Sequence, residues 1–464
     1  MLAWAQSGAG RLLLLLTFTA LFYPLYTPYL LPGRPGPWQI ILSAALCSLA
    51  GSYRAYMLAL TTLAGPLLAP DWYPSGWLKN LAEQQGLPPH SLFPLQLLAV
   101  AYLALMTTAF YRLRRKYPQS WPLPALFLLY AVNLALVLSP LSAGPAGLLL
   151  YTGLWAFSAY FWFIAFALRD ASSPQASPAW FQLATFHPYF GGSIIPLGLG
   201  AAHLRQRQAK DNQSLARCQL KGIKLLLACW VASGLLAALI RLRQWARLPE
   251  FSLILHQYLD GQVFYPRSLC WLSLLEAFPE SLMQGFLLGN LLIGAARIGG
   301  FQLLQQVYQP WGARSIADYW NRVSYYYKET VLQLFFYPCY LRYFKGWPRL
   351  RQAFAIFMAA GVGNLLFHIR LLVPQLLQRG PLETLRGMHT YFCYCLILCA
   401  GLYFSQLKSS QQRAALTLRQ RILTLGSIFL FYSLLGVFDE LYSPWGPWAR
   451  CKFLAYLWGW RGAP

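Results

Sequence analysis

The sequence predicts an all-α, polytopic membrane protein. Of its 464 residues, 57% are hydrophobic and only 11% are charged, whereas an average soluble domain has roughly 25% charged residues. Apolar stretches of about 20 residues, the length that a helix needs to cross a bilayer, recur along the chain. Aromatic residues make up 16% of the chain, which is typical of a protein with many membrane–water interfaces. This composition excludes an ordinary soluble enzyme.

The apolar stretches predict about eleven membrane-spanning helices. We expect them near residues 12–31, 38–68, 94–111, 123–139, 145–168, 222–240, 268–296, 330–344, 353–373, 390–406 and 421–438. The stretch 38–68 contains Arg54 and is either one broken helix or two shorter ones. Pro and Gly interrupt the apolar segment 178–203, which predicts a re-entrant or broken segment. Because Pro and Gly also occur throughout the spans, we expect bent helices around a central tunnel in a single integral membrane domain, residues 1–464.

The basic residues argue against nucleic-acid binding. The formal net charge is +24, but the basic residues form short clusters between apolar spans and not a stripe on a soluble surface. Positive-inside topology and contact with anionic lipids explain most of these charges. We therefore expect membrane lipids as partners and no nucleic acid, in a multi-pass protein of a bacterial inner membrane or an internal membrane.

The cysteines predict neither a disulfide framework nor a metal site. Most of the nine cysteines lie within apolar stretches, where they are expected to be small buried side chains. Cys393 and Cys395 lie on different faces of a helix, and no His or carboxylate follows at ligand spacing. We expect no metal and no permanently bound cofactor.

His368 is the polar residue that most needs an explanation, because it lies deep in the apolar stretch FAIFMAAGVGNLLFHIRLLVP. Asn364 precedes it by one helical turn, so both share a face, and the Asn364 amide can bond a ring nitrogen and fix its tautomer. The alternative is a core histidine satisfied by a neighbouring helix. His187, in the broken segment 178–203, is a second candidate to line a cavity.

A polar helix is predicted upstream of His368, within residues 315–342. Asp318 and Arg322 are four residues apart, the spacing of a helical ion pair, and Trp320 and Ser324 share another face. The segment then becomes apolar. We interpret it as a membrane-surface helix that leads into a buried one.

In their order along the chain, these elements resemble the membrane-bound O-acyltransferase family. The resemblance covers residues 311–370. The matching residues are Ser315, Asp318, Tyr319, Trp320, Arg322, Tyr337, Pro338 and His368. The resemblance implies transfer of an acyl group from a thioester to a hydroxyl, in some branches to an amine, within a membrane tunnel, and His368 corresponds to the family's invariant histidine.

The sequence departs from the family pattern at Ser324, where the family usually has His or Asn. Serine can donate a hydrogen bond but cannot act as a base. Either Asn321 or Asn364 supplies the missing role, or activity is altered or lost. Val323 also replaces a family Trp, and the family's Trp-His-Gly is Phe367-His368-Ile369 here.

The predicted mechanism uses His368 as a neutral general base that takes the proton of an acceptor hydroxyl as its oxygen attacks the thioester carbonyl. Asn364, Ser324 and Asn321 are candidate donors to the developing oxyanion. The candidate substrate-binding residues are Trp320, Arg322, Tyr325, His187, Arg342 and Lys345. The expected co-substrate is an acyl thioester, acyl-CoA or an acyl carrier protein, whose negative charges the basic residues would attract, and the acceptor is a hydroxyl-bearing saccharide, lipid or metabolite.

Two other functions fit part of the sequence. A transporter or lipid scramblase would also have broken spans and a cavity histidine, with Glu276 and Glu280 as the acidic candidates, although a pair at a helix end explains these glutamates more simply. A family member that has lost catalysis and serves as a scaffold in a membrane complex would explain Ser324.

Overall fold

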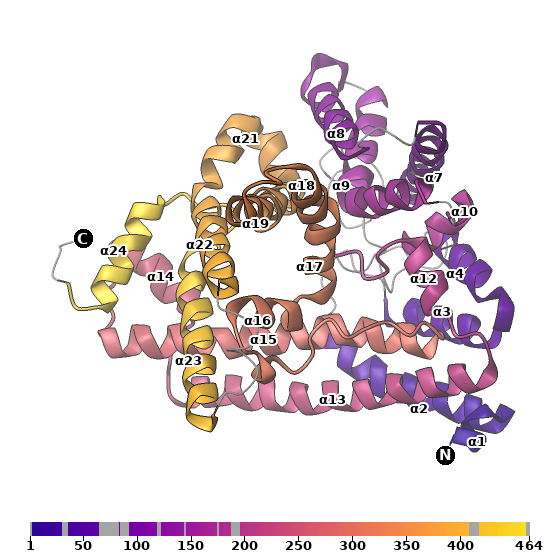
Figure 1. Ribbon diagram of the computed structural model, residues 1–464, viewed down its shortest axis with the longest axis horizontal. Helices are drawn as coiled ribbons and strands as arrows, with labels where there is room; N and C mark the ends of the chain where they lie inside the picture. Colours follow the sequence, from indigo (N-terminus) through magenta and orange to yellow (C-terminus); the bar gives the residue numbers. More distant parts are fainter. Residues whose placement is uncertain are drawn as a thin grey trace. The chain divides into compact units, whose positions relative to one another are not determined.

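The computed structural model describes residues 2–29, 36–64, 83, 92–117, 122–142, 145–173, 176–186, 195–407 and 417–460. These residues are almost entirely helical and contain no strand, only an isolated bridge between Gln208 and Phe301 (Figure 1). Within them, seven helices are long and apolar enough to cross a membrane. They are Gly8–Tyr26, Pro94–Lys116, Gly147–Ala171, Asn212–Trp245, Arg267–Ile298, Pro348–Gly387 and Leu418–Phe438. The all-helical class is confirmed, and these helices are those of a multi-pass membrane protein.

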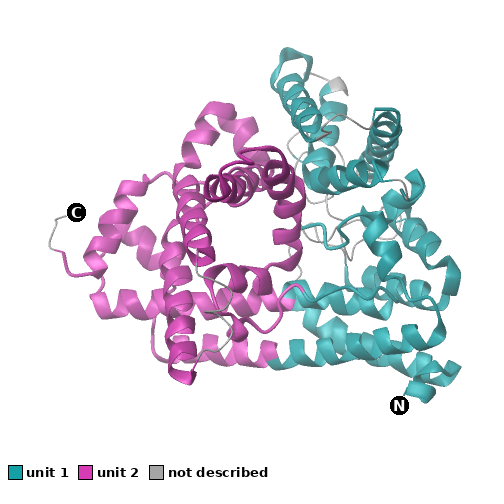
Figure 2. Cartoon of the chain, viewed as in Figure 1, with its two compact units in different colours: residues 1–231, 288–305 teal, residues 232–287, 306–464 magenta. Residues whose placement is uncertain are grey.

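The described residues cluster into two compact units (Figure 2). The first unit contains residues 1–231 and 288–305, and the second contains residues 232–287 and 306–464. Two long helices, α13 (Asn212–Trp245) and α15 (Arg267–Ile298), contribute residues to both units.

The other elements of the first unit range from single turns to long helices. They are α1 (Leu2–Gln6), α2 (Gly8–Tyr26), η1 (Thr27–Tyr29), α3 (Pro37–Leu49), η2 (Gly51–Tyr53), α4 (Arg54–Leu63), α7 (Leu92–Lys116), α8 (Pro122–Leu138), η4 (Pro140–Ser142), α9 (Pro145–Ala171), α10 (Ala179–Gln182), η5 (Leu183–Phe186) and α12 (Ala201–Arg207).

The predicted span 38–68 is two helices, α3 and α4, joined at Gly51, whose φ is +54°. The buried Arg54 stabilises this junction, because its Nε donates to Cys47 O at 2.9 Å and its Nη1 donates to Ala209 O at 2.8 Å. The guanidinium thus binds one carbonyl in the last turn of α3, which the helix end leaves without an intrahelical partner, and one carbonyl of the loop between α12 and α13. The described part of the segment 178–203 is also broken, into α10, η5 and the start of α12.

The second unit carries the motif residues. Its remaining elements are α14 (Phe251–Leu259), η6 (Pro310–Gly312), α16 (Ile316–Val323), α17 (Tyr325–Val331), η7 (Leu332–Phe336), α18 (Tyr337–Arg342), α19 (Pro348–Ile356), η8 (Phe357–Gly363), α20 (Asn364–Ile369), η9 (Arg370–Leu372), α21 (Val373–Gly387), α22 (His389–Gln406), α23 (Leu418–Leu435), η11 (Gly436–Phe438) and α24 (Pro447–Leu457). The predicted span 353–373 is therefore the middle of a longer helical run, and α22 packs beside its first part (Figure 1).

Candidate active site

Helix α16 has the polar pattern that the sequence predicted. Ser315 is its N-cap, and Ser315 Oγ accepts the Asp318 N–H at 3.0 Å. The Asp318 carboxylate binds Arg322 Nε at 3.1 Å, as the spacing of four predicts. Arg322 Nη1 also donates to Gln309 O at 3.4 Å. Arg322, a predicted substrate-binding residue, therefore holds α16 to the loop before it.

Two π-helical segments, η7 and η8, pack against each other next to the site. Gly363 makes this packing possible, because a Cβ at this position would lie 2.8 Å from the Phe335 ring. π-helical turns are rare and often occur at functional sites. Asn364 and His368 follow directly after η8, on α20.

The His368 ring is held through its Nδ1 atom. Nδ1 lies 2.9 Å from the backbone oxygen of Asn364 and 3.0 Å from the Tyr391 hydroxyl. The ring is half-buried, whereas Asn364 and Phe367 are buried. Among the described residues, no group hydrogen-bonds to Nε2 of His368.

The side chain of Asn364 binds two tyrosines. Its Oδ1 accepts hydrogen bonds from the hydroxyls of Tyr391, at 3.0 Å, and Tyr327. The Tyr327 ring lies 4.8 Å from that of Phe367, in a T-shaped arrangement. Helices α17, α20 and α22 therefore meet at one polar amide.

These contacts assign the tautomer of His368. A backbone carbonyl only accepts hydrogen bonds, so Nδ1 carries the proton that it donates to Asn364 O. The Tyr391 hydroxyl donates its proton to Asn364 Oδ1, so its oxygen can also accept from Nδ1–H. A neutral ring protonated at Nδ1 has its lone pair at Nε2, the nitrogen that is unpaired among the described residues.

Asn364 does bind His368, as the sequence predicts, but through a different group from the predicted one. The backbone carbonyl of Asn364, and not its amide, binds the ring. This follows from helical geometry, because the carbonyl of residue i points toward residue i+4. The amide oxygen is occupied by Tyr327 and Tyr391, which the sequence analysis did not identify as site residues.

The other candidate oxyanion donors lie on or beside α16. Asn321 is exposed, and Ser324 is half-buried at the junction of α16 and α17. Within the part of the chain that the structure describes, neither side chain hydrogen-bonds to His368. Trp320 is closer to the site, since its ring centroid lies 6.2 Å from that of Tyr327.

The remaining predicted substrate-binding residues are spread over the second unit or fall outside it. Tyr325 is half-buried, with the Lys328 ammonium 4.8 Å above its ring. Arg342 and Lys345 are exposed at and after the end of α18. His187 lies outside the described residues. In the described residues, no group of three or more His, Cys, Asp and Glu side chains is placed to hold a metal.

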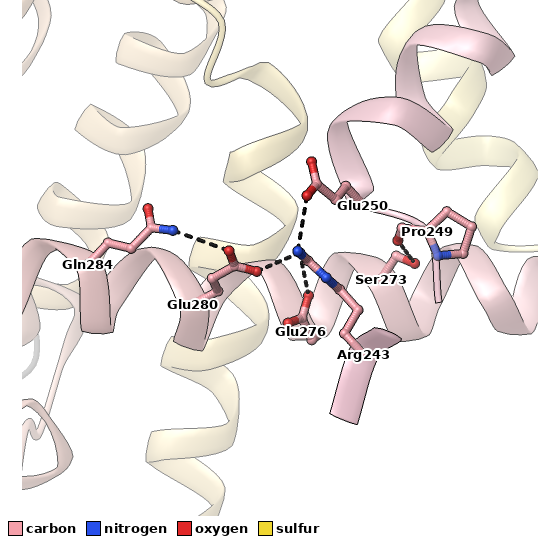
Figure 3. Close-up of polar contacts among 7 residues, drawn as sticks. All are labelled: Arg243, Pro249, Glu250, Ser273, Glu276, Glu280 and Gln284. Atoms are coloured by element: carbon pink, nitrogen blue, oxygen red, sulfur yellow. Dashed lines mark hydrogen bonds and ion pairs between the residues drawn. The ribbon is translucent and has the colours of Figure 1, made fainter. Parts of the chain in front are cut away.

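A second polar cluster in the same unit surrounds Arg243 (Figure 3). Its guanidinium binds Glu280 at 2.6 Å, Glu250 at 3.0 Å and Glu276 at 3.8 Å. Gln284 donates to the other oxygen of Glu280 at 3.2 Å. The side chains of Arg243, Glu276 and Glu280 are only 12%, 12% and 16% exposed. The paired glutamates therefore share one cation.

Comparison with known proteins adds no assignment: no family model matches the chain, and no curated protein is significantly similar to it. The geometry around His368 and the order of the motif residues are therefore the basis for a functional proposal.

Proposed function

We propose that this protein is a membrane-embedded O-acyltransferase, which moves an acyl group from a thioester donor to the hydroxyl of a saccharide, lipid or small metabolite. One observation carries the proposal. His368 has a ring whose Nδ1 is bound to Asn364 and Tyr391, while Nε2 is left without a partner among the described residues. A fixed, neutral imidazole with a free lone pair is the form that a general base requires.

The reaction follows from that lone pair. Nε2 removes the proton of the acceptor hydroxyl as the hydroxyl oxygen bonds to the thioester carbonyl carbon. The tetrahedral intermediate then breaks its carbon–sulfur bond, and the leaving thiolate takes the proton back from the imidazolium. The products are an ester and a free thiol, and the histidine is regenerated. Such base catalysis contributes about 10²–10⁴-fold.

A hydrogen-bond donor is needed for the negative charge that develops on the carbonyl oxygen. Asn364 Nδ2 is the first candidate, because two other polar atoms of this residue already belong to the network: Oδ1 binds Tyr327 and Tyr391, and the backbone O binds the His368 ring. Ser324 and Asn321 are the alternatives. One such donor is worth about 10²–10³-fold in turnover.

The thioester donor is a polyanion if it is acyl-CoA or an acyl carrier protein. Arg342 and Lys345 are exposed, and neither forms an ion pair with another described residue. Their exposed positive charges would attract such a donor to the end of α18. The proposal includes a tunnel to His368 through a bundle of about eleven membrane crossings.

The test is acyl transfer by the purified protein in lipid nanodiscs, with labelled acyl-CoA or acyl carrier protein and a panel of hydroxyl acceptors. We expect transfer by the wild type and about a 10²–10⁴-fold loss in His368→Gln, which removes the base and keeps a polar side chain. His256→Gln is the matched control, because His256 is 43% exposed and binds Glu440, outside the network described above.

Equal transfer by the wild type and His368→Gln would remove His368 from the mechanism. Absence of transfer by a folded wild type with every donor and acceptor would instead favour a family member that acts as a scaffold. The departure at Ser324 motivates that second outcome.

A further inference from the structure

Three buried oxygen atoms without a hydrogen-bond partner occur together at the end of α9, in the first unit. They are Asp170 Oδ1, Ser177 Oγ and Gln182 Oε1, and no described residue hydrogen-bonds to any of them. The residues are almost completely enclosed, since Asp170 is 7% exposed and Ser177 and Gln182 are 0% exposed. Buried polar atoms are normally hydrogen-bonded, so three unpaired oxygens in one place need an explanation.

Hydrogen bonds to the second oxygen of Asp170 hold these residues together. Asp170 Oδ2 accepts the backbone N–H of Ser177 at 3.3 Å and the Nε2 of Gln182. Ser177 is also fixed by Tyr111 of α7, whose hydroxyl donates to Ser177 O at 2.5 Å. Helix α10 packs against α7, and η5 packs against α9 (Figure 1). Each unpaired oxygen therefore belongs to the Asp170 carboxylate or to a residue bonded to it.

The amide of Gln182 has one favourable orientation. A carboxylate only accepts hydrogen bonds, so the NH₂ group of Gln182 must face Asp170 Oδ2. The amide oxygen then has no donor. A rotation of the Ser177 hydroxyl toward Asp170 would pair one carboxylate oxygen but would still leave Gln182 Oε1 unpaired. The cluster therefore lacks positive charge, and it has more acceptors than donors.

The position of Asp170 on its helix makes this lack more costly. Asp170 is the next-to-last residue of α9 (Pro145–Ala171), where the helix dipole already places negative partial charge. Asp170 forms no ion pair with another described residue, and the basic Arg169 and Arg205 are both exposed. A buried carboxylate is unfavourable unless it is paired or binds a metal ion.

We propose that Asp170, Ser177 and Gln182 bind a monovalent alkali cation, Na⁺ or K⁺. Hard cations prefer oxygen ligands, and carboxylate, amide and hydroxyl oxygens are the atoms left unpaired in this cluster. One carboxylate balances one positive charge, whereas a divalent ion would leave an excess positive charge in a buried place. The cation links the end of α9 to α10 and stabilises the first unit. The proposal does not depend on acyl transfer.

The experiment is hydrogen–deuterium exchange of the protein in nanodiscs of zwitterionic lipid, in NaCl, KCl or N-methylglucamine chloride of equal ionic strength. The organic cation is too large for an enclosed site. The reporter is the peptide that contains Ser177 and Gln182, because the Ser177 N–H donates to Asp170 Oδ2. We expect this peptide to exchange at least about tenfold more slowly in Na⁺ or K⁺, and the temperature of unfolding to rise by about 2–4 °C.

Two variants and a matched control assign the effect to the cluster. In Asp170→Asn, which removes the charge, the cation no longer slows the exchange. Ser177→Ala removes only one ligand, so it keeps the proposal testable if Asp170→Asn does not fold. We expect Ser177→Ala to raise the half-maximal cation concentration by about tenfold. The control is Asp211→Asn, an exposed acid of the same unit whose role as the cap of Ser214 N–H asparagine can keep.

Four outcomes overturn the proposal. The first is equal exchange of the wild type in alkali and organic cations. The second is an alkali effect of the same size in Asp170→Asn. The third is an effect of Mg²⁺ or Ca²⁺ alone, which rejects a monovalent ion. The fourth is exchange that slows on acidification and does not respond to alkali cations, because a proton shared by Asp170 and Gln182 would then occupy the place of the cation.

Discussion

The His368 and Arg243 clusters both consist of polar side chains in the second unit, but they differ in how their polar groups are paired. Three carboxylates surround the Arg243 guanidinium (Figure 3). At His368, hydrogen bonds engage Nδ1, and Nε2 stays unpaired among the described residues. A polar group in an apolar helix is expensive unless it is paired. The comparison teaches that pairing stabilises the structure, whereas a single unpaired atom in an otherwise satisfied network is available for chemistry.

The largest effect on stability is expected where the Arg243 cluster is broken. Arg243→Gln leaves Glu276 and Glu280 close together without their cation, and removing one partner of a buried ion pair costs about 3–5 kcal/mol. We expect a lower temperature of unfolding in nanodiscs and little change in the acyl-transfer rate per folded molecule. The double variant Arg243→Gln with Glu280→Gln should recover part of the stability, because it removes one of the stranded charges.

A loss of transfer in a folded Arg243→Gln protein would break the comparison, since it would make the Arg243 cluster part of the chemistry.

An intermediate effect is expected at Gly363, which lets η8 approach η7. The Cβ of alanine would lie 2.8 Å from the Phe335 ring, and overpacking of this kind costs about 1–3 kcal/mol. Gly426→Ala is the matched control, because a Cβ there has no atom within 4 Å. Thermal unfolding of the two variants checks the prediction, and equal unfolding temperatures would mean that η7 moves away freely.

The smallest effect is expected at Tyr391, which positions the His368 ring and has no part in the proposed proton transfer. Tyr391→Phe removes a donor to Asn364 and a partner of His368 Nδ1, so one hydrogen bond of about 1 kcal/mol is lost at each group. We expect kcat to fall by about tenfold with KM little changed. Tyr403→Phe, on the same helix α22, is the control.

An unchanged kcat in Tyr391→Phe would show that the Asn364 carbonyl alone fixes the ring. A loss as large as that of His368→Gln would mean that Tyr391 takes part in the reaction itself.

The sequence predicts the parts of this site that lie close together along the chain. The spacing of Asn364 and His368 places them on one face, and the spacing of Asp318 and Arg322 predicts their ion pair. Tyr391 cannot be found this way, because it is 23 residues from His368 and comes from another helix. Its only sequence signal is an aromatic-rich helix, and nothing in that pattern indicates which hydroxyl points at the imidazole.

The same limit applies to the fold, because a sequence pattern predicts single helices but not the contacts between helices. Hydropathy locates long apolar helices, and the two-helix alternative for the stretch 38–68 is correct. Hydropathy does not reveal the π-helical segments η7 and η8, because they depend on how two helices pack at Gly363 and Phe335. The division of α13 and α15 between two units is likewise set by contacts far apart in the sequence.

The direction of the His368 imidazole depends on how the π-helical segment η8 is wound. A π turn holds about one residue more than an α turn, and one residue corresponds to about 100° of rotation about a helix axis. If Phe357–Gly363 were wound as regular α-helix with the same number of residues, the helix beyond it would turn by about 100° and His368 would point away from Tyr391. The direction of His368 Nε2 is thus set by the one extra residue that the π turn holds, several positions before the histidine itself.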